Sequence, residues 1–231
     1  GGAIGLQARE VGLDGVRFSG QTKTAIVAEG VLRGRKLHFT STIAGIDGVV
    51  AKDAKVSLVE AKFQGGFRRA IDVSGGELRL SGVNFEGAMT AVRALDANAA
   101  LDTCDASGGS AAAFFFAGGK LRVRGLDVQG YEFSLQLARG VEAKVEDVSA
   151  RGAAQTCLAF EQSTVELSRA RMSRCGVGGA VSSMDTKLTA SDLAVRDGRE
   201  LGVLVHRGEA SFIQLDVRGI SDGDALQVRE G

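Results

Sequence analysis

Acidic side chains recur along the chain at nearly equal intervals. Asp105, Asp127 and Asp147 stand roughly 20–22 residues apart, and Asn84 precedes them by a similar interval. Carboxylate oxygens are preferred ligands of Ca²⁺, so these aspartates, stacked on neighbouring repeats, could hold calcium. Two carboxylates about 4.8 Å apart repel by only about 0.9 kcal/mol in water, so such a stack needs no ion. Calcium at the three aspartates is one interpretation, and a solvated acidic column without metal is the other.

A second candidate site places an acid next to a base. Asp72 and Arg93 share one phase of the repeat, and Phe115 and Gln136 continue it. The whole phase consists of Val50, Asp72, Arg93, Phe115, Gln136, Ala159, Ser182, Leu204 and Gln227. Hydrolysis by two carboxylates needs a second acid within about 5–10 Å, which this phase does not offer. We therefore predict a surface ion pair between Asp72 and Arg93, worth about 0–1 kcal/mol, within a four-residue surface that binds a substrate or partner.

The other chemically reactive residues form no catalytic pattern. His38 and His206 are many repeats apart, which leaves a Ser-His-Asp or Cys-His site without supporting geometry. The three cysteines, Cys104, Cys157 and Cys175, are too few and too irregularly spaced for a disulfide framework or a zinc site. We predict that Cys104 and Cys157 fill the core, and we expect no metal and no cofactor.

The elements that position these residues follow a repeat of roughly 22 residues. Within 121–128 the apolar residues Leu121, Val123, Leu126 and Val128 alternate in two pairs, which suits two short strands and not an amphipathic helix. A third short apolar frame follows several residues later. A fixed period of this length is typical of solenoids. We predict an all-β, single-stranded, right-handed parallel β-helix over residues 1–231, with about ten coils, three short strands per coil and a corner at 124–125.

The same frame predicts which side chains lie inside. One inward column is expected at Phe18, Phe39, Phe63, Phe85, Ala106, Val128, Val148, Met172, Val195 and Val217. A second is expected at Ile71, Val92, Phe114, Leu135, Leu158, Val181, Val203 and Leu226. In 141–152 the frame points Glu146 inward, where an unpaired carboxylate is unfavourable, so we predict a bulge that places Val145 inside. Phe67 and Phe115 are the expected exposed rings.

In its period and phase, nearly the whole chain resembles the pectate-lyase-like family of parallel β-helices. In enzymes of that family, carboxylates and basic residues gather on the outer face of one sheet, in a groove between long loops. There they act as acid/base pairs or bind calcium beside a basic residue. The comparable face of this chain carries Asp72 and Arg93, and its corners are short. The resemblance also implies a bacterial protein that is exported or attached to the cell surface.

Composition limits the partners. The chain has 28 basic and 28 acidic residues, so no long-range attraction draws it to nucleic acid or to an anionic membrane. The chain has no stretch of about 18 consecutive apolar residues, so the sequence predicts no membrane span. Proline is absent, which suits strands that are paired on both sides. We expect a polysaccharide or a protein as the partner.

No polar cap is evident at either end of the repeat. This predicts that residues 1–231 are a segment of a larger protein, and that the chain associates end to end or side by side. We expect a non-catalytic spacer or interaction module of an extracellular or cell-surface protein. The alternative is a polysaccharide lyase or a glycoside hydrolase whose catalytic residues the sequence does not reveal.

Overall fold

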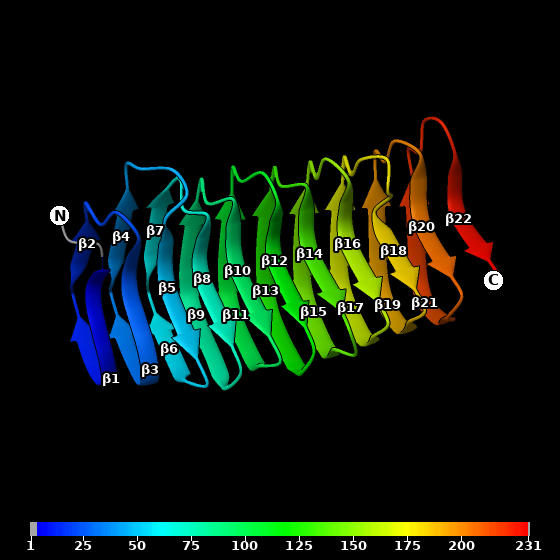
Figure 1. Cartoon of the computed structure of the whole chain (residues 1–231). Helices are drawn as coiled ribbons and strands as arrows, with labels where there is room; N and C mark the ends of the chain where they lie inside the picture. The colour runs from blue at the N-terminus through cyan, green and yellow to red at the C-terminus, as the bar shows by residue number, and fades with distance from the viewer. Residues whose placement is uncertain (1–3, 231) are drawn as a thin grey trace.

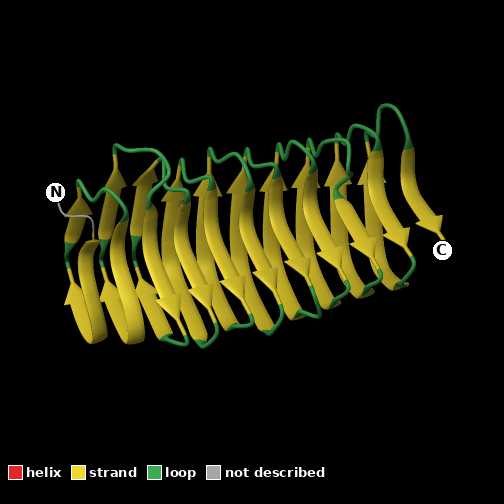
Figure 2. Cartoon of the chain, in the orientation of Figure 1, coloured by secondary structure: helices red, strands yellow, loops and turns green. Residues whose placement is uncertain are grey.

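The computed structural model describes residues 4–230, which form parallel-paired β-strands and no helix. The coils stack into a rod with the first and last described strands at opposite ends (Figure 1), and loops connect the strands at the corners (Figure 2). None of the described residues belongs to a helix long and apolar enough to span a membrane. The strands are β1 (Ile4–Asp14), β2 (Arg17–Ser19), β3 (Thr24–Arg35), β4 (His38–Ser41), β5 (Asp47–Lys52), β6 (Lys55–Val59), β7 (Lys62–Gly65), β8 (Arg69–Ser74), β9 (Glu77–Glu86), β10 (Thr90–Leu95), β11 (Asn98–Ser107), β12 (Ala112–Ala117), β13 (Lys120–Gln129), β14 (Phe133–Ala138), β15 (Glu142–Arg151), β16 (Thr156–Glu161), β17 (Thr164–Ser173), β18 (Val181–Met184), β19 (Lys187–Arg196), β20 (Leu201–His206), β21 (Glu209–Arg218) and β22 (Asp224–Arg229).

Each strand pairs with the equivalent strand one coil away. Leu101 of β11, for example, lies opposite Leu80 of β9 and Val123 of β13, and all three side chains are buried. Residues that share a phase of the sequence therefore stack directly on one another inside the rod. This confirms the predicted all-β parallel solenoid of about ten coils that repeat roughly every 22 residues.

The predicted three short strands per coil are partly joined. From β9 onward, the first two frames of each coil form one continuous strand of 10 residues that bends near its middle. The bend is a single residue with positive φ, such as Gly125 at 73° and Asp147 at 57°. Glycine adopts this conformation without steric strain, and aspartate tolerates it better than most residues. One left-handed residue is thus enough to turn the corner that we expected at 124–125.

Stacked phenylalanine rings fill the core near the N-terminal end. The ring centroids of Phe18 and Phe39 lie 5.0 Å apart, those of Phe39 and Phe63 4.3 Å apart, and those of Phe63 and Phe85 5.2 Å apart. This confirms the start of the first inward column. The second column keeps its register from Ile71 to Leu226 and is buried as far as Val203, but Leu226 in the last coil is 45% exposed. Its Phe114 meets Phe85 edge-on at 5.9 Å. Stacked and edge-on aromatic pairs each add to the stability that burial provides.

Two predictions for residues 141–152 are wrong. Ala150, and not Val148, continues the phenylalanine column, because it pairs with Val128 and Met172. Val145 lies inside and Glu146 points outward, as predicted, but no bulge interrupts β15 and the register is unbroken. The cause is Asp147, which takes the left-handed corner position that Gly125 holds one coil earlier. Because aspartate does not mark a corner as clearly as glycine does, the frame was placed incorrectly.

A disulfide joins Cys157 to Cys175, contrary to our prediction that the cysteines form no such bond. Cys157 lies in β16, in an inward column of small residues, and Cys175 lies in the corner that follows β17 one coil later. The Cα atoms are 5.6 Å apart, so the bond ties two neighbouring coils together. The separation of 18 residues does not match the repeat, because the partners occupy different columns. Cys104 is a buried free thiol, as expected.

Aromatic side chains at the corners are buried. Phe67 is 1% exposed and packs edge-on against Phe63, so the prediction of an exposed ring is wrong there. Tyr131, also 1% exposed, fills the space beside Gly109, where a Cβ atom would lie 2.0 Å from the tyrosine ring. Burial raises the pKa of the Tyr131 phenol. At this corner the large side chain of Tyr131 therefore depends on the absence of a side chain at Gly109.

Candidate functional site

The four predicted site residues lie side by side on one outer face. Asp72 of β8 pairs with Arg93 of β10, which pairs with Phe115 of β12, which pairs with Gln136 of β14. We call this surface the third-strand face: the outward side chains of β5, β8, β10, β12, β14, β16, β18 and β20. The predicted central column is present in this register from Val50 to Gln227.

Asp72 is more deeply enclosed than a surface ion pair. It is 7% exposed, and Arg93 donates a hydrogen bond from Nε to Oδ1 at 2.9 Å. A second cation, Arg69, lies with Nη1 2.6 Å from Oδ2 of the same carboxylate. The predicted pair with Arg93 therefore exists, but Asp72 is buried beneath two arginines.

Three further residues of this group were not predicted from the sequence. Asp47 of β5 accepts hydrogen bonds from Arg68, at 2.6 Å to Oδ2, and from Arg69, at 3.2 Å to Oδ1. We call the five residues, Asp47, Arg68, Arg69, Asp72 and Arg93, the Asp47–Asp72 cluster. Asp47 pairs with Arg69 in the sheet. In the sequence, the adjacent arginines Arg68 and Arg69 were therefore the available signal of a cationic partner for Asp47. The extra residues of the second coil obscured that register.

Both acids of the cluster are occupied by cations. Each carboxylate accepts contacts from two guanidinium groups, and arginine cannot be deprotonated in proteins. The hydrogen bond to Asp47 raises the pKa of Arg68 further above its ordinary value. A general base needs a free lone pair facing the substrate, and a general acid needs a transferable proton. In this arrangement the cluster stabilises the sheet and offers neither.

The third-strand face is shallow and mostly uncharged beyond the cluster. Its nearest marked hollow, of about 140 Å³, lies farther along the rod and includes Gln136, Ala159 and Ser182 in its lining. Phe115 and Leu204 are partly exposed in the central column. The face is thus flat, with a few apolar side chains between small polar ones.

The acidic column is shorter than predicted. Asp105 pairs with Asn84 and Asp127, but Ser149 takes the next position, and Asp147 lies at the corner instead. The predicted stack of three aspartates at one phase is therefore wrong, and the calcium interpretation that depended on it falls with it. The residues that the structure describes contain no group of three or more His, Cys, Asp or Glu side chains able to hold a metal ion. Partial desolvation and then the charge of Asp127 raise the pKa of Asp105.

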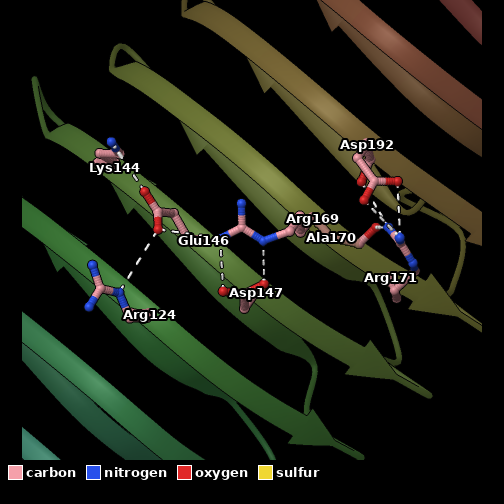
Figure 3. Close-up of polar contacts among 8 residues, drawn as sticks. All are labelled: Arg124, Lys144, Glu146, Asp147, Arg169, Ala170, Arg171 and Asp192. Carbon is pink, nitrogen blue, oxygen red and sulfur yellow. Dashed lines mark hydrogen bonds and ion pairs between the residues drawn. The ribbon is translucent and has the colours of Figure 1, made fainter.

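Acids near the bend of β15 are held by cations from neighbouring coils (Figure 3). Arg169 donates to Asp147 at 2.6 and 2.9 Å. The carboxylate of Glu146 lies 3.1 Å from Lys144, 3.4 Å from Arg169 and 4.0 Å from Arg124. The hydrogen bond from Lys144, followed by the charges of these cations, lowers the pKa of Glu146. This surface therefore binds carboxylates between stacked cations.

No family model, curated protein or solved structure matches the chain. The parallel β-solenoid is thus shown by the structure itself, and the resemblance to the pectate-lyase-like family remains a prediction from the sequence. Because one fold serves many activities, function has to be inferred from the surface that this chain presents.

Proposed function

We propose that the chain is a non-catalytic β-helical spacer or interaction module whose third-strand face contacts a partner. One observation carries this proposal: both carboxylates of the Asp47–Asp72 cluster are occupied by arginines. The remaining central column, with Phe115 and Gln136 beside the cluster, supplies contact area without reactive groups. A rod of stacked coils also holds such a face rigidly along its length.

The alternative is a polysaccharide lyase or glycoside hydrolase. The proximity of two acids and three arginines in the cluster favours it, since acids beside a basic residue are what such chemistry requires. Against it stand the full pairing of Asp47 and Asp72 and the absence of a deep hollow around them among the main hollows of the described surface. An enzyme at this position would have to break the cluster to free a base.

We also propose that the protein is exported or attached to a bacterial cell surface. The disulfide between Cys157 and Cys175 supports this, because such bonds persist in oxidising compartments. The expected partner there is a glycan or a protein, and a second copy of the chain is a further candidate for side-by-side contact.

A glycan-array screen of the wild-type chain, run with and without calcium, tests the proposed contact surface. The informative variant is Phe115→Ser, which removes the partly exposed ring. The matched control is Val177→Ser, at a side chain that is 40% exposed in the corner between β17 and β18, outside the strands that carry this face. We expect Phe115→Ser to weaken binding at least tenfold and Val177→Ser to leave it unchanged. Equal binding by all three proteins would rule out the third-strand face as the contact surface.

A further inference from the structure

A long groove follows a different face of the rod. Its largest hollow, of about 690 Å³, lies on the first halves of β9, β11, β13, β15 and β17, which stand side by side in Figure 1. A hollow of about 320 Å³ adjoins it, and two more, of about 330 and 400 Å³, continue toward the N-terminal end. Four of the main hollows of the described surface thus lie in one line, away from the third-strand face.

The centre of this groove is a column in which arginines alternate with small residues. Arg33 pairs with Ser57, Ser57 with Arg79, Arg79 with Ala100, and Ala100 with Arg122. Neighbouring coils are about 4.8 Å apart, so the three arginines repeat roughly every 9.6 Å. Ser57 and Ala100 line the hollows between them. We call this surface the arginine groove.

Acidic and basic side chains on the walls of the arginine groove largely pair with one another. On one side Lys55 lies 3.6 Å from Glu77, and Lys120 lies 3.1 Å from Glu142. On the other side the acid Glu146 is held by cations. Of these wall acids, only Glu77 also contacts a central arginine, Arg79, at 3.5 Å.

The central arginines themselves are open to solvent. Within residues 4–230, Arg33 and Arg122 make no ion pair, and Arg79, with a side chain 71% exposed, has one contact of 3.5 Å to Glu77. Asp102 borders the groove, and beyond Arg122 the column continues with Lys144 and then Glu166. The positive charge is thus concentrated along the centre line from Arg33 to Lys144.

The protein already shows how this surface holds an anion. Glu146 extends a carboxylate between Lys144 and cations of the neighbouring strands, and its side chain is 16% exposed (Figure 3). Arginine and lysine bind carboxylate, sulfate and phosphate groups through charge-assisted hydrogen bonds. An external anion beside Arg122 would meet the same chemistry without a competing protein carboxylate, and beside Arg79 it would compete only with the long, exposed contact to Glu77.

We propose that the arginine groove binds an extended acidic polysaccharide, with its carboxylate or sulfate groups at Arg33, Arg79 and Arg122 and its sugar rings over Ser57 and Ala100. A spacing of two coils suits a linear glycan that carries one charged group per disaccharide. Nucleic acid fits less well, because the groove residues include no aromatic side chain on which a base could stack. This site is separate from the third-strand face and does not depend on the function proposed for it.

The test measures binding of the full chain to hyaluronan, dextran sulfate and uncharged dextran. Hyaluronan and dextran sulfate separate carboxylate from sulfate recognition. The informative variant carries Arg33→Gln, Arg79→Gln and Arg122→Gln together. The control carries Arg139→Gln, Arg174→Gln and Arg199→Gln, which remove the same charge from exposed corners outside the groove. Measurements at about 0.01 M and about 1 M NaCl vary the screening length from roughly 30 to 3 Å.

We expect binding to at least one acidic glycan at low salt, loss of that binding at high salt, and none to uncharged dextran. The groove variant should bind at least tenfold more weakly, and the control should stay within twofold of wild type. The proposal is overturned if neither acidic glycan binds, or if both variants lose affinity equally. It is also overturned if a single-stranded oligonucleotide binds through the same arginines more tightly than either glycan.

Discussion

Asp72 shows how one side chain can be decisive for stability while offering no chemistry. Its carboxylate contacts Arg69 and Arg93 and is almost fully buried. A charge in this position depends on its partners, because water no longer solvates it. The same burial and pairing that stabilise the ion pair keep Asp72 from accepting a proton from a substrate.

Removing the charge of Asp72 should therefore destabilise the fold. We predict that Asp72→Asn lowers the free energy of unfolding by about 2–4 kcal/mol, somewhat less than for a fully buried pair because Arg93 is partly exposed. Urea denaturation followed by circular dichroism measures it. The control is Asp127→Asn, which breaks an exposed pair with Arg151 and should lose less than about 1 kcal/mol. Equal losses for the two variants would contradict the structural role of the cluster.

Arg169 should make stability depend on pH at the bend of β15. Its hydrogen bond holds the pKa of Asp147 below the ordinary value of 3.8. The folded state then binds protons less readily than the unfolded state, so the stabilisation exists above pH 3.8 and is lost as the pH falls through the lower folded-state pKa. We predict that Arg169→Gln lowers the melting temperature at neutral pH but not at the acid end of a pH series. Arg139→Gln is the control, and an Arg169→Gln deficit of constant size at every pH would refute the prediction.

At the scale of elements, corners depend on a few residues that fit only one arrangement. Gly109 lies against Tyr131, and a Cβ atom there would also meet the carbonyl oxygen of Ala88 at 2.2 Å. We predict that Gly109→Ala lowers the free energy of unfolding by about 1–3 kcal/mol, because overpacking forces the neighbours to shift. Gly12→Ala is the control, since no atom lies within 4 Å of its added Cβ. Chemical denaturation measures the free energy of unfolding of both variants. An unchanged value for Gly109→Ala would show that the corner has room for the added methyl group.

The disulfide fastens one coil to the next, and thiol counting can verify it. Burial raises the pKa of Cys104 to about 12, so the native protein should not react with a thiol reagent near pH 8. We predict one reactive thiol after denaturation without reductant and three after reduction, because Cys157 and Cys175 are bonded. Replacing both bonded cysteines by serine should reduce stability by about 2–4 kcal/mol. Three thiols in the unreduced, denatured protein would exclude the bond.

Each element could be predicted to the extent that its residue types indicate their position within the repeat. Leu121, Val123, Leu126 and Val128 alternate unambiguously, and the strands formed where expected. Asp147 failed as a corner marker because aspartate also occupies outward strand positions. The pairing of Cys157 with Cys175 could not be read from the repeat, since it crosses between columns that meet only in three dimensions.

At the scale of the whole molecule, stacking converts a sequence period into long, regular faces. Each coil contacts its neighbours alone, so a residue type that recurs in phase becomes a column. The sequence identified the column of Asp72, Arg93, Phe115 and Gln136 correctly. It did not reveal Asp47, Arg68 and Arg69, because insertions in the second coil shift the count. The arginine groove also escaped notice, since its positive charges appear in every second coil and the chain as a whole is neutral.

The measurement that tests the account most directly is turnover. The full chain would be incubated for a long period with a panel of acidic and neutral polysaccharides, with and without calcium. Reducing ends report hydrolysis, and ultraviolet absorbance reports unsaturated lyase products. The account predicts no product above that of a buffer control, including on any glycan that the chain binds. Product that forms with the wild type and with Arg139→Gln, but disappears with Asp72→Ala or Arg93→Ala, would contradict a non-catalytic module and make the Asp47–Asp72 cluster an active site.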